Sequence, residues 1–137
     1  VTAYGEKIGV AFQLIDDVID LSPKAEQTGK RAGTDLRAGV VTMPLLLLRD
    51  RAARGDAAAT EFLARIDAGV ARIAAGEDAA ILDPEVTELR EHEVTRETEQ
   101  AARQWAADAV AALAPLPKSA VKRGLERLAE SIVTREG

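Results

Sequence analysis

Three aspartates lie within a strongly apolar stretch, "AFQLIDDVIDLSP", at residues 11–23. Asp16, Asp17 and Asp20, together with Gln13, follow the i, i+3, i+4, i+7 spacing that places side chains on one face of a helix. Carboxylates with no neighbouring histidine or cysteine are ligands for hard, oxygen-seeking cations such as Mg²⁺. The spacing therefore predicts a Mg²⁺ site on one face of a helix that is otherwise buried.

An ordinary amphipathic helix whose polar face meets water is the alternative. Two features favour the metal site over it. The face carries only acids, with no Lys or Arg between Ile8 and Leu21, and acids near a helix C-terminus are disfavoured by about 0.3–1 kcal/mol each. Asp16 and Asp20 add a repulsive i,i+4 pair. A bound cation would offset both costs.

A segment rich in glycine and cations follows at residues 22–41. Glycines let the backbone approach a ligand closely, and Lys or Arg can neutralise phosphate charge. Because Mg²⁺ usually bridges carboxylates and phosphate oxygens, we expect the helix and this loop to hold a phosphorylated ligand together. Lys30 is the preferred phosphate ligand over Arg31, since it directly follows Gly29 and lies nearer to the acidic helix. A solvated surface loop is the alternative.

Proline, glycine and capping residues divide the chain into helices, and no segment shows the alternation of a β-strand. Thr42 is expected to cap one helix and Asp56 another. The pattern predicts an all-α helical bundle, with helices over 2–21, 42–55, 56–69, 84–113 and 117–133 and one short helical turn near 35–37.

Composition narrows the remaining classes of protein. Apolar residues make up 47% of the chain but aromatics only 3%, so small and branched aliphatic side chains must fill the core, which favours helices. The net charge of −5 argues against nucleic-acid binding through a general positive field. The absence of cysteine and the single histidine, His92, exclude disulfide scaffolds and thiolate or multi-histidine metal sites. No apolar run is long enough to span a membrane, and we expect a cytoplasmic protein.

The acidic helix and the glycine loop together resemble the second aspartate-rich region of the trans-isoprenyl diphosphate synthases, the polyprenyl synthetase family. The matching residues are "GVAFQLIDDVIDL" and "GKRAGTDLRAGVVTMP", which follow the pattern FQxxDDxxD and then GKxxGxDxxxGxxTxP. The resemblance implies helices packed around a deep central cavity, the isoprenoid synthase fold. It assigns residues 1–137 to the C-terminal segment of a single polyprenyl synthetase domain. Val1 already lies in the first predicted helix, so we expect a fragment without its N-terminal part.

The resemblance also implies an activity: Mg²⁺-dependent head-to-tail condensation of an allylic diphosphate with isopentenyl diphosphate, which gives an all-trans polyprenyl diphosphate. It implies a homodimer, and the form "GVVTMP" around Val40 resembles medium- or long-chain enzymes. The implied roles are metal ligation and catalysis by Asp16 and Asp17, metal contact through water by Asp20, binding of the allylic diphosphate by Lys30, and contact with the diphosphate and the reacting carbons by Gln13 and Phe12.

The family's first aspartate-rich motif is absent from the chain, so we expect the fragment alone to be inactive. A non-catalytic helical subunit that partners a prenyl synthase, or a plain helical interaction module with solvated acids, is the alternative. Two further residues are given structural roles. His92 is expected to be solvated in the middle of the long helix, and Trp105 is expected to pack in the core or against another subunit.

Overall fold

The computed structural model describes residues 2–23 and 31–134, and within them the regular structure is helical, with no β-strand. The all-α prediction is confirmed. No described helix is both long and apolar enough to cross a membrane. The elements are α1 (Thr2–Asp20), α2 (Thr34–Arg37), α3 (Met43–Ala53), α4 (Ala57–Ala74), the 3-10 helix η2 (Ala79–Leu82), α5 (Asp83–Glu91), α6 (Glu93–Ala111) and α7 (Ala120–Val133).

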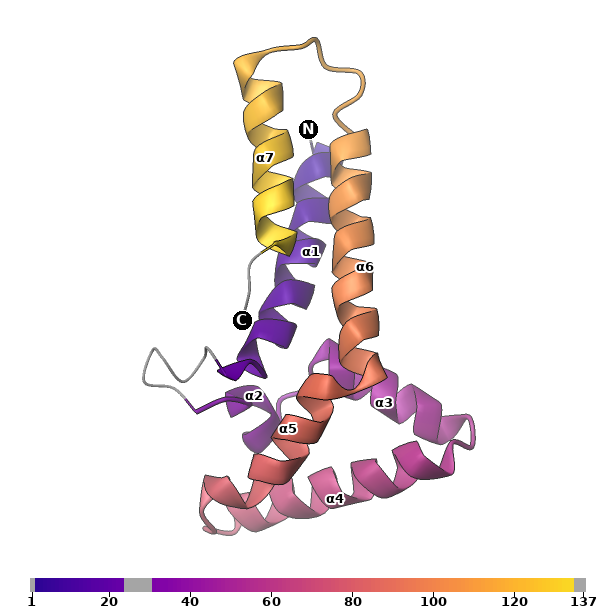
Figure 1. The fold of residues 1–137 in the computed structure, drawn as a ribbon, viewed down its shortest axis with the longest axis vertical. Coiled ribbons are helices and arrows are strands. Elements are labelled where there is room, and N and C mark those ends of the chain that lie inside the picture. The colour runs from indigo at the N-terminus through magenta and orange to yellow at the C-terminus, as the bar shows by residue number, and fades with distance from the viewer. Residues whose placement is uncertain (1, 24–30, 135–137) are drawn as a thin grey trace.

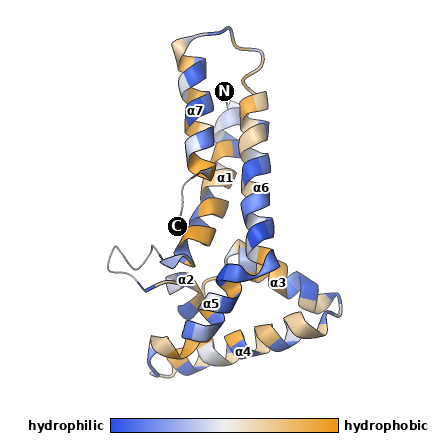
Figure 2. Ribbon diagram, in the orientation of Figure 1, coloured by the Kyte–Doolittle hydropathy of each residue, from blue (hydrophilic) through white to orange (hydrophobic). Residues whose placement is uncertain are grey.

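The helices form an upright group of three above a base (Figure 1). In the upright group α1 lies between α6 and α7, while α3, α4 and α5 make up the base, with α2 near the lower end of α1. Figure 2 shows that much of α1 is apolar where it runs between the two more hydrophilic neighbours. Alanines at the contact of α1 with α6 and α7 are buried and let the helix backbones approach: Ala11, Ala102, Ala106, Ala109 and Ala129.

The base has larger core side chains, including the fully buried Phe62 and Leu48. The sequence predicts a helix over 56–69 in the base, but the corresponding helix, α4, continues to Ala74. Gly69 is needed for packing, since a Cβ there would lie 2.3 Å from Leu82 Cδ2. The helix ends before Gly76, whose φ of 108° favours glycine.

The predicted helix over 84–113 is wrong, because the chain breaks at His92 into α5 and α6. His92 has an extended backbone, and its Nδ1 accepts a hydrogen bond of 3.1 Å from the Val94 N–H, which caps α6. Its half-buried ring stacks on Phe62 at 5.7 Å. The break turns α5 into the base and lets α6 follow α1, so the prediction of a solvated mid-helix histidine is also wrong.

The C-terminal helix closes the upright group. Ser119 caps α7, and the Tyr4 hydroxyl of α1 donates a 2.6 Å hydrogen bond to the Leu125 carbonyl. Trp105, predicted in the core or at a subunit contact, is 38% exposed, with the Lys7 ammonium 5.4 Å from its ring centroid. The core placement is wrong because small alanines of α6 fill the contact with α1, and the indole lies at the exposed edge of that contact beside Lys7.

Candidate functional site

The loop after α1 returns to the end of that helix and fixes α2 there. The Gly33 N–H donates to the Asp20 carbonyl at 2.7 Å, and the Asp35 N–H donates to Asp20 Oδ2 at 3.2 Å. Gly33 has a φ of 76°, and a Cβ on it would lie 2.6 Å from Val86 Cγ2. A glycine is therefore required here both for the turn and for the close approach to α5. Asp20 thus holds α2 against α1.

Asp17 connects α1 to α3. Its side chain is only 9% exposed, and both of its oxygens accept hydrogen bonds. Oδ1 accepts from Gln13 Nε2 at 3.0 Å, and Oδ2 accepts from the Met43 N–H, also at 3.0 Å. Thr42 is the N-cap residue of α3, as predicted, but its side chain makes no cap hydrogen bond. The carboxylate of another helix has taken that role.

Asp16 lies differently from its neighbour, since it is exposed. No hydrogen bond from another described side chain or backbone group to its carboxylate is found, and no described Lys or Arg forms an ion pair with Asp16, Asp17 or Asp20. The acidic stripe is therefore wider than predicted. Asp17 points toward α3, Asp16 points toward solvent, and Asp20 lies half-buried between them. The prediction that α1 is buried around most of its circumference is wrong for Val10 and Phe12, which are exposed.

Burial and neighbouring carboxylates act together on Asp20. Its pKa is raised above the usual value, first by burial, then by the nearby Asp35 carboxylate and by Asp17 and Asp16; the hydrogen bond from the Asp35 N–H opposes this shift only in part. The carboxyl groups at the end of α1 therefore repel one another, which is the electrostatic condition that a divalent cation would relieve.

Arg31 and Arg37, the described arginines of the loop and α2, contact the base and not the acids of α1. Arg37 is buried; its Nε donates to the Ala32 carbonyl at 2.9 Å, and its guanidinium also contacts the Ala79 carbonyl and Asp83. Arg31 pairs with the same Asp83 at 3.2 Å. These two arginines fasten the loop to the base. Lys30 lies outside the described residues, so its role as phosphate ligand stays a prediction.

Arg90 of α5 stabilises the end of the acidic helix. Its Nε donates a 2.6 Å hydrogen bond to the carbonyl of Leu21, directly after the last turn of α1. A guanidinium at a helix C-terminus satisfies an orphan carbonyl and opposes the negative end of the dipole. This contact joins residues 69 positions apart, so no local signal in the sequence could have found it.

A depression of about 370 Å³ lies between α1 and the segment that enters α3. Gln13, Asp17 and Asp35 supply its polar side. Most of the rest of its wall is apolar: Val10, Val40, Val41 and Leu46 are exposed, Met43 is half-buried and Leu14 is buried. A wall with one acidic side and one apolar side suits a ligand with a polar end, a bridging cation and a hydrocarbon tail.

No three acidic or histidine side chains in the described ranges are grouped closely enough to hold a metal ion by themselves. A cation here would take one or two carboxylates and complete its shell with water and ligand oxygens, which is how Mg²⁺ usually binds. The donor set, carboxylate oxygens without sulfur or imidazole, fits such a hard cation.

Comparison with known proteins identifies the family. The model of the polyprenyl synthetase family matches residues 1–75, more than half of the chain. This chain belongs to the polyprenyl synthetase family. It is 37% identical over 134 residues to the octaprenyl diphosphate synthase of Haemophilus influenzae, an alignment that covers 96% of this chain and 37% of that protein. This chain thus spans less than two fifths of the length of that relative.

Solved structures of polyprenyl synthetases agree with the fold. A polyprenyl synthase from Caulobacter crescentus, complexed with calcium and isoprenyl diphosphate, matches with a TM-score of 0.76 and 35% identity over 98% of this chain and 38% of that one. The heptaprenyl diphosphate synthase of Staphylococcus aureus matches with a TM-score of 0.77 at 23% identity, which supports the fold alone. The resemblance of the motif to this family is confirmed, and the isoprenoid synthase fold with it.

Proposed function

We propose that this chain forms one wall of the active site of a trans-polyprenyl diphosphate synthase. The reaction is the head-to-tail condensation of an allylic diphosphate with isopentenyl diphosphate, dependent on Mg²⁺. The observation that carries the proposal is the acidic end of α1, where Asp16, Asp17 and Asp20 lack a described cationic partner and Asp17 lines a depression with an apolar wall. Membership of the family supports the same reaction.

In this proposal Asp16, Asp17 and Asp20 give the cation site its charge, and Lys30 and Gln13 contact the allylic diphosphate. Ionisation of the allylic C–O bond places negative charge on the departing diphosphate, and a bound Mg²⁺ would neutralise that charge. The isopentenyl double bond then attacks the allylic cation, and the new carbocation loses a proton to the departed diphosphate, which restores a double bond. Phe12 and the apolar wall around Val40 exclude the water that would otherwise quench the allylic cation.

The proposal assigns residues 1–137 to the C-terminal segment of one synthetase domain, because the acidic motif resembles the second of the family's two. Under this proposal, the remainder of the active site comes from a synthase as long as the relatives. A long-chain product fits "GVVTMP" at 39–44, and the H. influenzae relative is an octaprenyl diphosphate synthase. The homodimer stays a prediction from the family resemblance, and the cytoplasmic location stays a prediction from the sequence.

The test is a substitution in a synthase of full family length that contains this segment. Asp16→Ala should lower turnover of farnesyl diphosphate with isopentenyl diphosphate by about 100-fold or more, the scale of losing one preorganised charge contact, with helicity unchanged. Asp50→Ala, an exposed acid of α3 that pairs with Arg54 on the surface, is the matched control and should leave turnover unchanged. Equal turnover in the wild type and the Asp16 variant would contradict the proposal, and measurable turnover by residues 1–137 alone would contradict the incomplete site.

A further inference from the structure

We propose that the two adjacent aspartates of the acidic motif have different tasks. Asp17 is a positioning residue that locks α1 to the N-terminus of α3, and the charge offered to a cation comes from Asp16 and Asp20. This differs from the equal ligation of the metal by Asp16 and Asp17 that the family resemblance implies. The lock itself stands on contacts within the chain, whereas the part about the cation rests on the proposed function.

The contacts of Asp17 are those of a cap. Its Oδ2 accepts the first N–H of α3, from Met43, and the N-cap residue Thr42 supplies no side-chain acceptor of its own. The next residue, Pro44, has no N–H, so Met43 carries the first of the orphan donors at this helix end. A carboxylate at this position also meets the positive end of the α3 dipole.

Gln13 holds the Asp17 side chain in place from one turn earlier on α1. Its amide donates to the second carboxylate oxygen at 3.0 Å, so neither oxygen of Asp17 lacks a hydrogen bond within the protein. With an exposed fraction of 9%, Asp17 is nearly closed to solvent. The adjacent Asp16 is exposed, and Asp20 has one backbone donor, from Asp35. Hydrogen bonds within the protein thus occupy the carboxylate of Asp17, whereas the carboxylates of Asp16 and Asp20 are more available to a cation.

The lock also shapes the depression. The chain enters α3 through residues 40–43, which line its apolar side, and the Asp17 bond to Met43 is where this segment is tied to α1. Loss of the bond would free the first turn of α3 and move the wall. A defect in an Asp17 variant would then come from a displaced wall, and not from a missing metal ligand.

The lock is tested by amide hydrogen exchange and thermal unfolding of the 137-residue chain without metal. Asp17→Ala should speed exchange of the Met43 amide by at least tenfold and lower Tm by about 3–6 °C, the shift expected for losing a helix cap in a domain of this size. Asp17→Asn should restore both values, because its amide oxygen can accept from Met43 while its NH₂ donates to a flipped Gln13. Asp16→Asn is the matched control: it should leave the exchange of the Met43 amide unchanged and should not lower Tm, since it only relieves repulsion with Asp20. If the Asp17→Asn chain were as unprotected and unstable as the Asp17→Ala chain, the lock would be overturned.

The division of tasks is tested separately, by titrating a full-length synthase with Mg²⁺ in the presence of inorganic diphosphate. Asp16→Asn should weaken the apparent Mg²⁺ affinity tenfold or more, and Asp17→Asn less than threefold. Equal weakening by both variants would overturn the division and make Asp17 a ligand. If neither variant weakens Mg²⁺ binding, the division and the proposed cation site both fail, while the exchange of the Met43 amide still decides the lock.

Discussion

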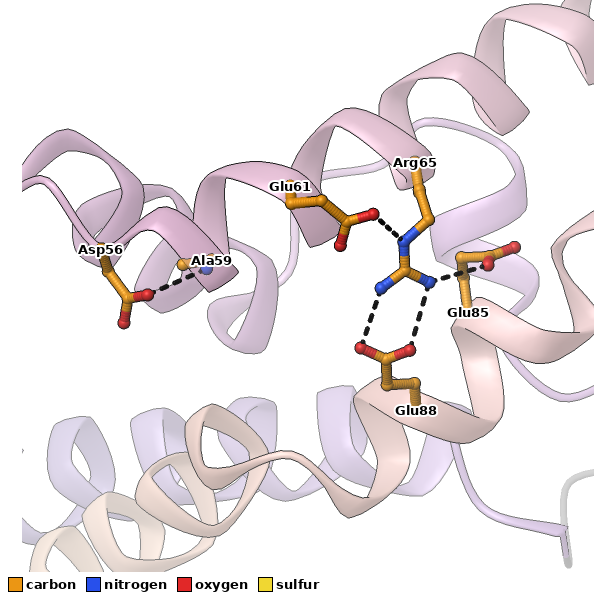
Figure 3. A network of polar contacts seen from close by, with 6 residues as sticks. All are labelled: Asp56, Ala59, Glu61, Arg65, Glu85 and Glu88. Carbon is orange, nitrogen blue, oxygen red and sulfur yellow. Dashed lines mark hydrogen bonds and ion pairs between the residues drawn. The ribbon is translucent and has the colours of Figure 1, made fainter.

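Two acidic regions of this molecule differ in whether their carboxylates have a cationic partner. In the base, Arg65 of α4 lies among three glutamates: its Nε binds Glu61 at 2.8 Å, and its other nitrogens reach Glu85 at 3.2 Å and Glu88 at 3.1 and 3.2 Å (Figure 3). These hydrogen bonds, chiefly those with Glu61 and Glu88, raise the pKa of Arg65 above its already high value. At the end of α1, three aspartates have no described cationic partner.

The difference shows which cluster is structural. The Arg65 group joins α4 to α5, and each of its three carboxylates has the guanidinium as a cationic partner, which the α1 acids lack among the described residues. Exposed pairs of this kind contribute about 0–1 kcal/mol each to folding. The α1 acids repel one another and oppose the helix dipole, which costs stability without a bound cation. We infer that this cost persists because the charge serves binding.

The largest expected effect comes from giving the α1 acids an internal cation. Gln13→Arg would place a guanidinium at i−3 and i−4 from Asp16 and Asp17 and so reproduce the arrangement around Arg65. In the full-length synthase, turnover should fall about 100-fold or more because the guanidinium pairs with the carboxylates that would hold the cation, while the chain gains about 0.2–0.5 kcal/mol per new pair. Steady-state kinetics and thermal unfolding measure the two effects.

Gln104→Arg is the matched control for that substitution. Gln104 also lies four residues before an aspartate, Asp108, with which it forms a 2.9 Å hydrogen bond on the surface of α6. The control should gain similar stability and keep full turnover. A Gln13→Arg enzyme with wild-type turnover would show that the charge of the α1 acids is not used.

A smaller effect is expected when the paired cluster is broken. Arg65→Ala leaves Glu61, Glu85 and Glu88 without their shared partner and removes the guanidinium stacked 5.0 Å from the Phe62 ring centroid. We expect a loss of about 1–2 kcal/mol in the free energy of unfolding by urea, the sum of several weak surface pairs and the cation–π contact. Mg²⁺ affinity should not change; a weakened affinity would contradict the separation of the two regions.

The smallest effect is a dependence of stability on pH at Asp20. Because its folded pKa is raised, Asp20 favours the folded state below the pKa of the unfolded chain, and this contribution is lost as pH rises through the folded pKa. Asp20→Asn keeps an acceptor for the Asp35 N–H and removes the charge. Without divalent cations the variant should be more stable than the wild type by about 0.5–1 kcal/mol at pH 7, with a smaller gap near pH 3. An equal gap at both pH values would contradict the repulsion.

Short-range patterns in the sequence predicted much of this site. The spacing of Asp16 to Asp20, the turn near Asp35 and the start of a helix at Thr42 all depend on residues a few positions apart, and the structure has them. The motif also identified the family. The difference between Asp16 and Asp17 was not predictable, because it depends on the Met43 amide 26 positions away.

The errors in the fold have the same origin. Nothing near His92 marks a break, because no glycine or proline is there; the ring finds Phe62 on another helix and the side chain caps α6. Gly69 looked like a helix end but is required by contact with Leu82. Trp105 looked like core, although alanines let α6 lie closer to α1. Tertiary contacts decided each of these positions over local propensity.

The central claim, that the acids of α1 hold a divalent cation together with a diphosphate, is tested most directly by paramagnetic NMR. Mn²⁺, a probe for Mg²⁺, would be titrated with inorganic diphosphate into the ¹⁵N-labelled chain. We predict selective broadening of the amide signals of Asp16, Asp20 and Asp35, with those of Glu61 and Glu88 unaffected. Equal broadening at both acidic regions, or none at the end of α1, would contradict the claim.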